Sequence, residues 1–121
     1  MGLLDKLFTS RPKVVPTPVR TVADFQKHVL RSELPVIVDV WSLSCAPCRQ
    51  LAPVLVRVAT EHQDKVRVVE ISTESEPALL ARLGVRATPT VIVYDGGKEM
   101  GRVVGFKPKS WFDEMIATEF S

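Results

Sequence analysis

Two cysteines separated by two residues, Cys45 and Cys48, carry the most evident chemistry of this chain of 121 residues. They follow an apolar run that predicts a strand over residues 36–41, and apolar residues at helical spacing begin with them. A cysteine in the first turn of a helix has its thiolate stabilised by free backbone N–H groups and by the helix dipole, which lowers its pKa. Cys45 is therefore placed to attack a disulfide. Cys48, one turn later on the same side, is placed to resolve the mixed disulfide.

Three neighbouring residues bear on this chemistry. Ser44 is a candidate cap of the helix, and Pro47 supplies a fixed φ and no donor at an early helical position. Asp39 interrupts the apolar strand, where burial would raise its carboxyl pKa and make it a candidate base for Cys48. The alternative is that Asp39 marks an exposed strand end or accepts a hydrogen bond from a backbone amide. Both interpretations stay open on the pattern alone.

The spacing of the two cysteines is also that of half a zinc site. The chain has no second cysteine pair, and its two histidines, His28 and His62, are expected at exposed helix positions. One chain therefore cannot supply four nitrogen or sulfur ligands, and no metal site is predicted. Metal or iron–sulfur binding would require a dimer bridged by two such pairs. Two structural, unpaired cysteines would not explain their place between a strand and a helix.

Length and composition predict one ordinary globular domain. The chain is 45% hydrophobic and 25% charged, and no apolar run approaches the ~20 residues of a membrane span. A net charge of +2 without basic and aromatic interleaving argues against nucleic-acid binding. Two cysteines do not form the disulfide framework of a small secreted domain, and residues 1–8 lack the features of a secretory signal. The predicted location is therefore the cytoplasm.

Residues 1–19 are expected to precede a domain that spans residues 20–121. This extension contains a short apolar stripe at helical spacing, formed by Leu3, Leu4, Leu7 and Phe8. The stripe is interpreted as a locally packed terminus or, alternatively, as a docking helix for a partner or an anionic membrane surface through residues 1–13. Three prolines follow it: Pro12, Pro16 and Pro18. They indicate a linker with at most an edge strand over residues 14–20.

The rest of the chain alternates between helical and strand patterns. Helices are predicted over residues 22–31 with Thr21 as cap, from Cys45 or Ala46 to about residue 62, over 77–83, and from Pro108 onward. Strands are predicted over residues 36–41, 66–71, 91–95 and 100–104. Gly84 is expected to end a helix, and Gly96-Gly97 to form a hairpin turn. The predicted fold class is α/β, with a central mixed sheet flanked by helices on both faces.

Six short motifs together resemble the thioredoxin family over about residues 20–121. They are Val-Asp-Val-Trp-Ser (38–42), Cys-Ala-Pro-Cys (45–48), Ala-Pro (52–53), Ala-Thr-Pro-Thr (87–90), Gly-Gly-Lys (96–98) and Val-Gly-Phe (104–106). The resemblance implies a thioredoxin fold and a thiol–disulfide oxidoreductase that reduces protein disulfides. It implies no bound cofactor beyond a redox-active Cys45–Cys48 disulfide, with disulfide-containing proteins as substrates and a thioredoxin-reductase-like electron donor.

The resemblance also implies roles for individual residues. Cys45 is the implied nucleophile, Cys48 the resolving cysteine and Asp39 the buried acid that assists it. Pro89 is implied to be cis, so that the backbone of Thr88 can pair with an extended substrate segment. The same substrate surface is expected to include Trp41, Ser44, Ala46, Pro47 and Gly105. Gly105 is expected to leave room there for the substrate chain.

Three positions depart from the usual pattern of that family. Ser44 stands where Trp is usual, Ala46 where Gly is usual, and Glu70 where a buried Lys is common. Loss of the Trp removes an apolar contact surface for partners, and a Glu near Asp39 disfavours a second negative charge. The sequence leaves two alternatives to a reductase open. One is a partner-binding module with minor redox turnover, and the other is the metal-bridged or iron–sulfur-bridged dimer.

Overall fold

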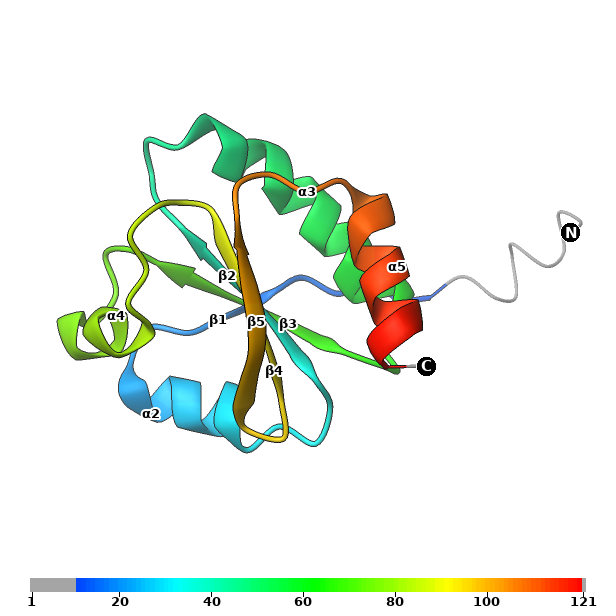
Figure 1. Ribbon diagram of the computed structural model, residues 1–121, viewed down its shortest axis with the longest axis horizontal. Coiled ribbons are helices and arrows are strands. Elements are labelled where there is room, and N and C mark those ends of the chain that lie inside the picture. Colours follow the sequence, from blue (N-terminus) through cyan, green and yellow to red (C-terminus); the bar gives the residue numbers. More distant parts are fainter. Residues whose placement is uncertain (1–10, 121) are drawn as a thin grey trace, which may run out of the picture.

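A computed structural model describes residues 11–120, and the apolar stripe predicted at residues 3–8 lies outside them. The described chain forms a five-stranded mixed sheet with helices on both faces (Figure 1), as the sequence predicts. The strands are β1 (Thr17–Pro18), β2 (Val36–Trp41), β3 (Arg67–Ser72), β4 (Thr90–Asp95) and β5 (Lys98–Val104). They lie in the order β1-β3-β2-β4-β5. β2 is therefore the central strand.

β2 has the bounds that the sequence predicts, because its run of β-branched residues is buried between two layers of helices. It pairs in parallel with β3 and antiparallel with β4. A parallel pair needs a crossover, and helix α3 (Ala46–Glu61) supplies it between β2 and β3. The end of β2, the loop after it and the first turn of α3 consequently meet at one end of the sheet.

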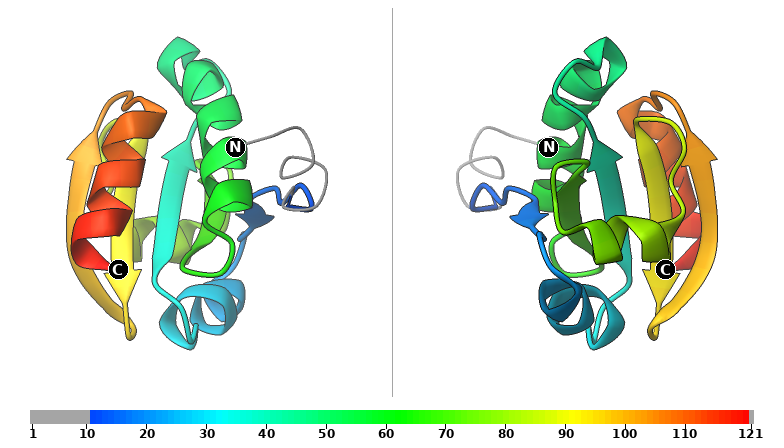
Figure 2. Two further views of the ribbon diagram at one scale, coloured as in Figure 1. Left: turned by 90° about the vertical axis from the view of Figure 1, so that its right-hand side faces the viewer. Right: turned by 90° about the vertical axis from the view of Figure 1, so that its left-hand side faces the viewer.

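The helices form two layers around the sheet (Figure 2). α3 and α5 (Lys109–Glu119) cover one face, where Leu55 and Phe112 are fully buried. α2 (Val22–Phe25), the π-helical turn η1 (Gln26–Leu30) and α4 (Pro77–Leu83) cover the other face, where Phe25 and Leu79 are buried. α3 continues through Pro53 without a break in its assigned residues. Among residues 11–120, no helix is long and apolar enough to span a bilayer.

The prediction of one regular helix over residues 22–31 is wrong in its second half. After Phe25 the chain winds into η1, where the N–H of Arg31 donates to the carbonyl oxygen of Gln26 at 3.0 Å. The predicted cap is confirmed, since Thr21 Oγ1 accepts from the N–H of Asp24 at 3.0 Å. Apolar spacing over five residues does not distinguish an i+4 from an i+5 hydrogen-bond pattern, so the sequence could not reveal this turn.

The edge strand expected over residues 14–20 is reduced to the two residues of β1. Pro16 and Pro18 cannot donate to a ladder, which limits the pairing with β3. The residues before β1 follow the C-terminal half of α3 instead, where the N–H of Val14 donates to Thr60 Oγ1 at 2.9 Å. β3 starts and ends one residue later than the predicted 66–71.

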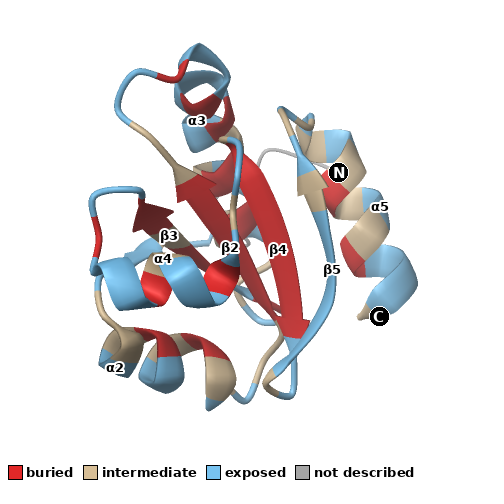
Figure 3. Cartoon of the chain, turned by 60° about the vertical axis from the view of Figure 1, so that its left-hand side comes forward, coloured by how far each residue is buried: buried red, intermediate tan, exposed pale blue. Residues whose placement is uncertain are grey.

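β4 and β5 form the predicted hairpin around Gly96-Gly97, and both glycines have positive φ. Gly97 also lies against η1, since a Cβ at this position would stand 2.9 Å from the carbonyl oxygen of Leu30. β5 begins at Lys98, two residues before the predicted 100, and it is the exposed edge of the sheet (Figure 3). The predicted left-handed cap at Gly84 is confirmed by its φ of 63°.

Candidate active site

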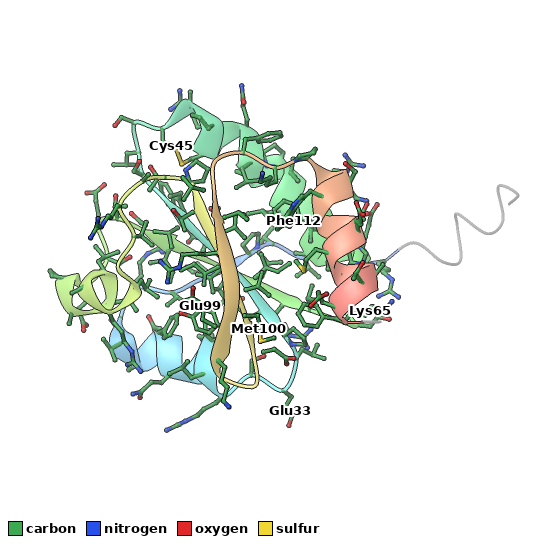
Figure 4. The ribbon with its side chains drawn as sticks, in the orientation of Figure 1. Glu33, Cys45, Lys65, Glu99, Met100 and Phe112 are labelled. Atoms are coloured by element: carbon green, nitrogen blue, oxygen red, sulfur yellow. A yellow bond between two sulfur atoms is a disulfide. The ribbon has the colours of Figure 1, made fainter. Side chains whose placement is uncertain are left out.

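The two cysteines lie at the N-terminal end of α3, beside the end of the central strand (Figure 4). They are joined by a disulfide, and both are buried. Cys45 is the N-cap residue of α3, and its Sγ accepts a hydrogen bond from the N–H of Cys48 at 3.2 Å. The prediction that Ser44 caps the helix is therefore wrong, because the helix begins at Ala46 and its cap is one residue later.

Asp39 lies inside β2 with only 5% of its surface exposed. Its Oδ1 has no hydrogen-bond partner among the described residues. Burial is the main cause that raises the pKa of this carboxyl to about 7, and the negative charge of Glu70 adds to it. The alternative that Asp39 stands at an exposed strand end is wrong. The carboxyl can therefore gain or lose a proton near neutral pH.

Glu70 lies directly across from Asp39 in the parallel register of β2 and β3. Its carboxylate pairs with the guanidinium of Arg20 at 2.8 Å and accepts a hydrogen bond from the indole Nε1–H of Trp41. The expectation of a glutamate close to Asp39 is thereby confirmed. Two contacts fix the orientation of Glu70, which keeps its charge beside the buried acid.

A pocket of about 470 Å³ connects these groups. Its lining includes Asp39, Cys48, Trp41 and Glu70 together with apolar residues of α3 and of the loop after β2. Asp39 and Cys48 thus border one cavity that opens to solvent, so protons can pass between the cysteine, the acid and water.

The loop before β4 contributes the second half of the site. The Thr88-Pro89 peptide is cis, which confirms the prediction, and the carbonyl oxygen of Pro89 accepts from the N–H of Gly105 at 2.8 Å. Ser42 Oγ and Thr88 Oγ1 are 2.8 Å apart, which ties this loop to the segment before the cysteines. Sequence reasoning missed this hydroxyl pair, because 46 residues separate its members and nothing in either motif signals the contact.

The thioredoxin family model matches residues 16–118 of the chain. The chain belongs to the thioredoxin family. It is 40% identical over 94 residues to a thioredoxin of Synechocystis sp., which covers 78% of this chain and 88% of that relative. It is 44% identical over 86 residues to a thioredoxin of Streptomyces clavuligerus, covering 71% of this chain and 79% of that one.

A solved thioredoxin structure from Malassezia sympodialis has the same fold, with a TM-score of 0.77 at 24% identity over 89% of this chain and 92% of that one. The family model, the curated relatives and the Cys-x-x-Cys pair show that the protein is a thiol–disulfide oxidoreductase. It is of the thioredoxin type, which reduces protein disulfides. Membership of the thioredoxin family implies disulfide-containing protein substrates and a reductase as electron donor in general terms. Neither the partner-binding module nor the metal-bridged dimer gains support from them.

Within this thioredoxin fold, the residues predicted to bind substrate differ in exposure and in local contacts. Ser44, Ala46 and Pro47 are exposed around the cysteines. Trp41 is half-buried and is turned to Glu70 through its indole N–H. Gly105 has a φ of 98°, and a Cβ there would contact none of the described residues within 4 Å. The protein's own packing therefore does not require a missing side chain at Gly105, whereas the backbone conformation does.

The two histidines differ from their predicted exposed positions, because both are half-buried. His62 Nε2 lies 2.8 Å from Asp113 Oδ1, and together with Glu61 these residues bring three possible metal-ligand atoms within 4.8 Å of one another. The ammonium group of Lys109 pairs with both Glu61 and Asp113. A cation of the chain itself thus occupies this cluster, which joins the end of α3 to α5.

Proposed function

We propose that Cys45 is the nucleophile that attacks protein disulfides and that Cys48 resolves the resulting mixed disulfide. The observation that carries this assignment is the place of Cys45 as the N-cap of α3, with its sulfur accepting the N–H of Cys48. A thiolate at this position gains the hydrogen bond and the positive end of the helix dipole. Cys45 is also the more exposed of the two, at 8% against 4% for Cys48.

The proposed cycle starts with both cysteines reduced. The Cys45 thiolate attacks one sulfur of the substrate disulfide, whose S–S bond breaks and releases the first substrate thiolate. Cys48 then loses its proton and attacks Cys45 Sγ. The second substrate sulfur leaves, takes up a proton and becomes a thiol, while the two electrons lost by the dithiol have reduced the substrate. The Cys45–Cys48 disulfide is the oxidised end of this cycle.

Asp39 is proposed to accept the proton of Cys48. Both residues border the same pocket, and the buried carboxyl has a pKa raised to about 7 by burial and by Glu70. An acceptor whose pKa lies near the working pH transfers protons in either direction at little cost. Asp39 can therefore take the proton during resolution and release it to water through the pocket.

The cis loop is proposed to hold the substrate as an extended segment. Among residues 11–120, no backbone–backbone hydrogen bond engages the N–H or carbonyl of Thr88, so these groups are free to pair with another chain. Ser44, Ala46, Pro47 and Gly105 would border that segment. Because Ser44 offers little apolar area, we expect main-chain hydrogen bonds to dominate affinity and substrate choice to be broad.

We further propose a thioredoxin-reductase-like protein as electron donor and the cytoplasm as the compartment. Two cysteines in a redox-active pair, without a disulfide framework, support a reducing environment. Equilibrating the pair against glutathione tests this, since a potential near that of glutaredoxins or higher would point to an oxidant or isomerase instead.

Reduction of insulin disulfides with dithiothreitol tests the proposed mechanism. We expect Cys45→Ser to abolish the protein-dependent rate. Mixed with insulin after removal of dithiothreitol, reduced Cys48→Ser should accumulate a mixed disulfide between Cys45 and the substrate. Thr73→Ser, at an exposed position outside the site, serves as the matched control and should keep the wild-type rate. Wild-type activity in Cys45→Ser, or a mixed disulfide trapped by Cys45→Ser rather than Cys48→Ser, would contradict the assignment.

A further inference from the structure

The pocket beside Asp39 has the size and lining of a ligand site. Its volume of about 470 Å³ is within the ~300–1,000 Å³ of small-molecule sites and equals the space of roughly fifteen waters. The walls are mainly apolar and come from the segment before β1, from β2, from α3 and from the loop after β2. Six side chains form them: Pro16, Trp41, Leu43, Ala52, Leu55 and Val56. Leu43 stands at the opening, with 67% of its surface exposed.

Besides Ser42, whose hydroxyl pairs with Thr88 Oγ1, the floor of this pocket holds two carboxyl groups on adjacent strands, and only one of them is compensated. Glu70 pairs with Arg20 at 2.8 Å and accepts from the indole of Trp41. Asp39 has no ion pair among the described residues, and its Oδ1 accepts no hydrogen bond there. An ionised carboxylate that is 5% exposed and unpaired is costly in an apolar site. Among residues 11–120, no positive charge or strong donor compensates Asp39.

The remaining charged groups around the pocket do not supply it. Arg49 of α3 is exposed at the rim and donates from its guanidinium to the carbonyl oxygen of Leu43 at 3.5 Å. Cys48 is engaged in the disulfide and carries no charge. With Arg20 paired to Glu70, the pocket combines apolar walls with one acid at its floor, Asp39, that no described residue compensates.

We propose that this pocket binds a small organic amine, with an apolar body against the walls and a primary ammonium group at Asp39. An ammonium group offers three hydrogen-bond donors and a full positive charge. The Asp39 carboxyl has neither a donor at Oδ1 nor an ion pair among the described residues. Charge-assisted hydrogen bonds are strongest where water is excluded. A neutral ligand would gain only the apolar contact. A carboxylate ligand would meet two acids at the floor and be rejected.

Occupation of the pocket has a consequence for turnover, and this part alone rests on the proposed function. An ammonium group at Asp39 stabilises the ionised carboxyl and so weakens it as a proton acceptor, while the ligand body blocks the route from the acid to water. Deprotonation of Cys48 would then be slower. The amine would act as an inhibitor of resolution without touching the substrate segment at Thr88.

Binding is tested on the oxidised protein, which requires no turnover. Three probes of one shape are titrated into labelled protein and followed by NMR: phenethylamine, 2-phenylethanol and phenylacetate. The indole N–H of Trp41 is a direct reporter, because it lies in the pocket wall and is bonded to Glu70. We expect the amine to bind at least about tenfold more tightly than the alcohol, and phenylacetate not to perturb this signal.

The pH dependence separates Asp39 from the other groups. The amine stays protonated between pH 6 and 8, whereas Asp39, with a pKa of about 7, ionises over this range. Affinity for the amine should therefore rise about tenfold from pH 6 to pH 8, and the alcohol should show no such rise. Asp39→Asn should bind the amine about tenfold more weakly at pH 8 and remove the pH dependence.

A steric variant gives a test that does not alter charge. Val56→Phe places a larger side chain into the pocket and should abolish binding, while Val15→Phe makes the same change outside the pocket and should leave it unchanged. Equal affinity for amine and alcohol, or amine binding that ignores both pH and Asp39→Asn, would overturn the proposal. If the redox roles of Cys45 and Asp39 proved wrong, these binding results would be unaffected, so the two failures are distinguishable.

Discussion

The two ends of helix α3 hold acidic clusters of opposite character. At the N-terminal end, Asp39 is buried with an oxygen that has no partner among the described residues, and its pKa is raised to about 7. At the C-terminal end, Asp113 is half-exposed and is paired with Lys109 at 2.7 Å and His62 at 2.8 Å. Although burial opposes it, these partners keep the pKa of Asp113 below its usual value.

The difference between these two acids shows that their partners decide whether a carboxyl serves reactivity or stability. An acid whose partners are satisfied stabilises the fold at neutral pH, whereas an acid left without partners costs stability and remains free to exchange protons. The same helix thus connects a site that destabilises the protein to a cluster that fastens α3 to α5. Changes at the first end should cost activity, and changes at the second should cost stability alone.

Asp39→Asn should give the largest effect, and it should lower activity while raising stability at neutral pH. The folded-state pKa lies above the unfolded value of 3.8, so this carboxyl lowers stability as pH rises from about 4 to 7. The rise of the Asp39 pKa to about 7 corresponds to a loss of roughly 4 kcal/mol in the free energy of unfolding at high pH. The variant should recover much of this loss at pH 8 and none of it below pH 4. Insulin reduction should fall by ~100-fold. Urea unfolding at both pH values and the insulin assay measure these effects, and lower stability at pH 8 would contradict them.

Asp113→Asn should show the reverse pattern at the other end of α3. It removes the carboxylate held by Lys109 and His62, and such partly exposed pairs are worth ~1 kcal/mol or less each. The loss of stability should be complete above pH 4 and vanish as pH falls through the lowered pKa of Asp113. Turnover should be unchanged. Glu114→Gln, at an exposed position on the same helix, is the control in the same unfolding measurements.

Glu70→Gln sharpens the cause of the raised pKa at Asp39. Burial is the larger cause and the charge of Glu70 the smaller one, so the pKa of Asp39 should fall but stay well above 3.8. The midpoint of the pH–rate profile should move to lower pH in the same direction. Carbon NMR titration of the Asp39 carboxyl measures it, with Glu74→Gln on the exposed turn as control. An unchanged midpoint would mean that Arg20 already cancels the charge of Glu70.

Ser42→Ala should give the smallest effect. It deletes one member of the hydroxyl pair with Thr88, a bond worth about 1 kcal/mol, and loosens the loop that contains cis Pro89. We expect KM for a protein substrate to rise a few-fold, with little change in the rate on a small disulfide. Thr88→Val should behave in the same way, and the double variant should add nothing further. Additive losses would show that the hydroxyls act separately.

What the sequence could predict follows from how local each feature is. The bounds of β2 are readable from an uninterrupted β-branched run, and the fold class from the order of such runs. The cis Thr88-Pro89 bond could be predicted only through the family resemblance, because no local pattern distinguishes a cis from a trans proline. The contact between His62 Nε2 and Asp113 Oδ1 joins residues that are 51 apart in the sequence, and no local pattern predicts it. The state of Asp39 needed tertiary information too, because its burial depends on both neighbouring strands.

The contact beneath the β4–β5 turn limits where this protein can be engineered. Exposed hairpin tips are ordinarily the first choice for grafted peptides and circular permutation. Here a Cβ at residue 97 would lie 2.9 Å from the carbonyl oxygen of Leu30, which is a steric clash. An insertion at this position would therefore displace the hairpin from η1. The tip of the hairpin is therefore held against η1 at Gly97, and an insertion at this position should lower the stability of the protein.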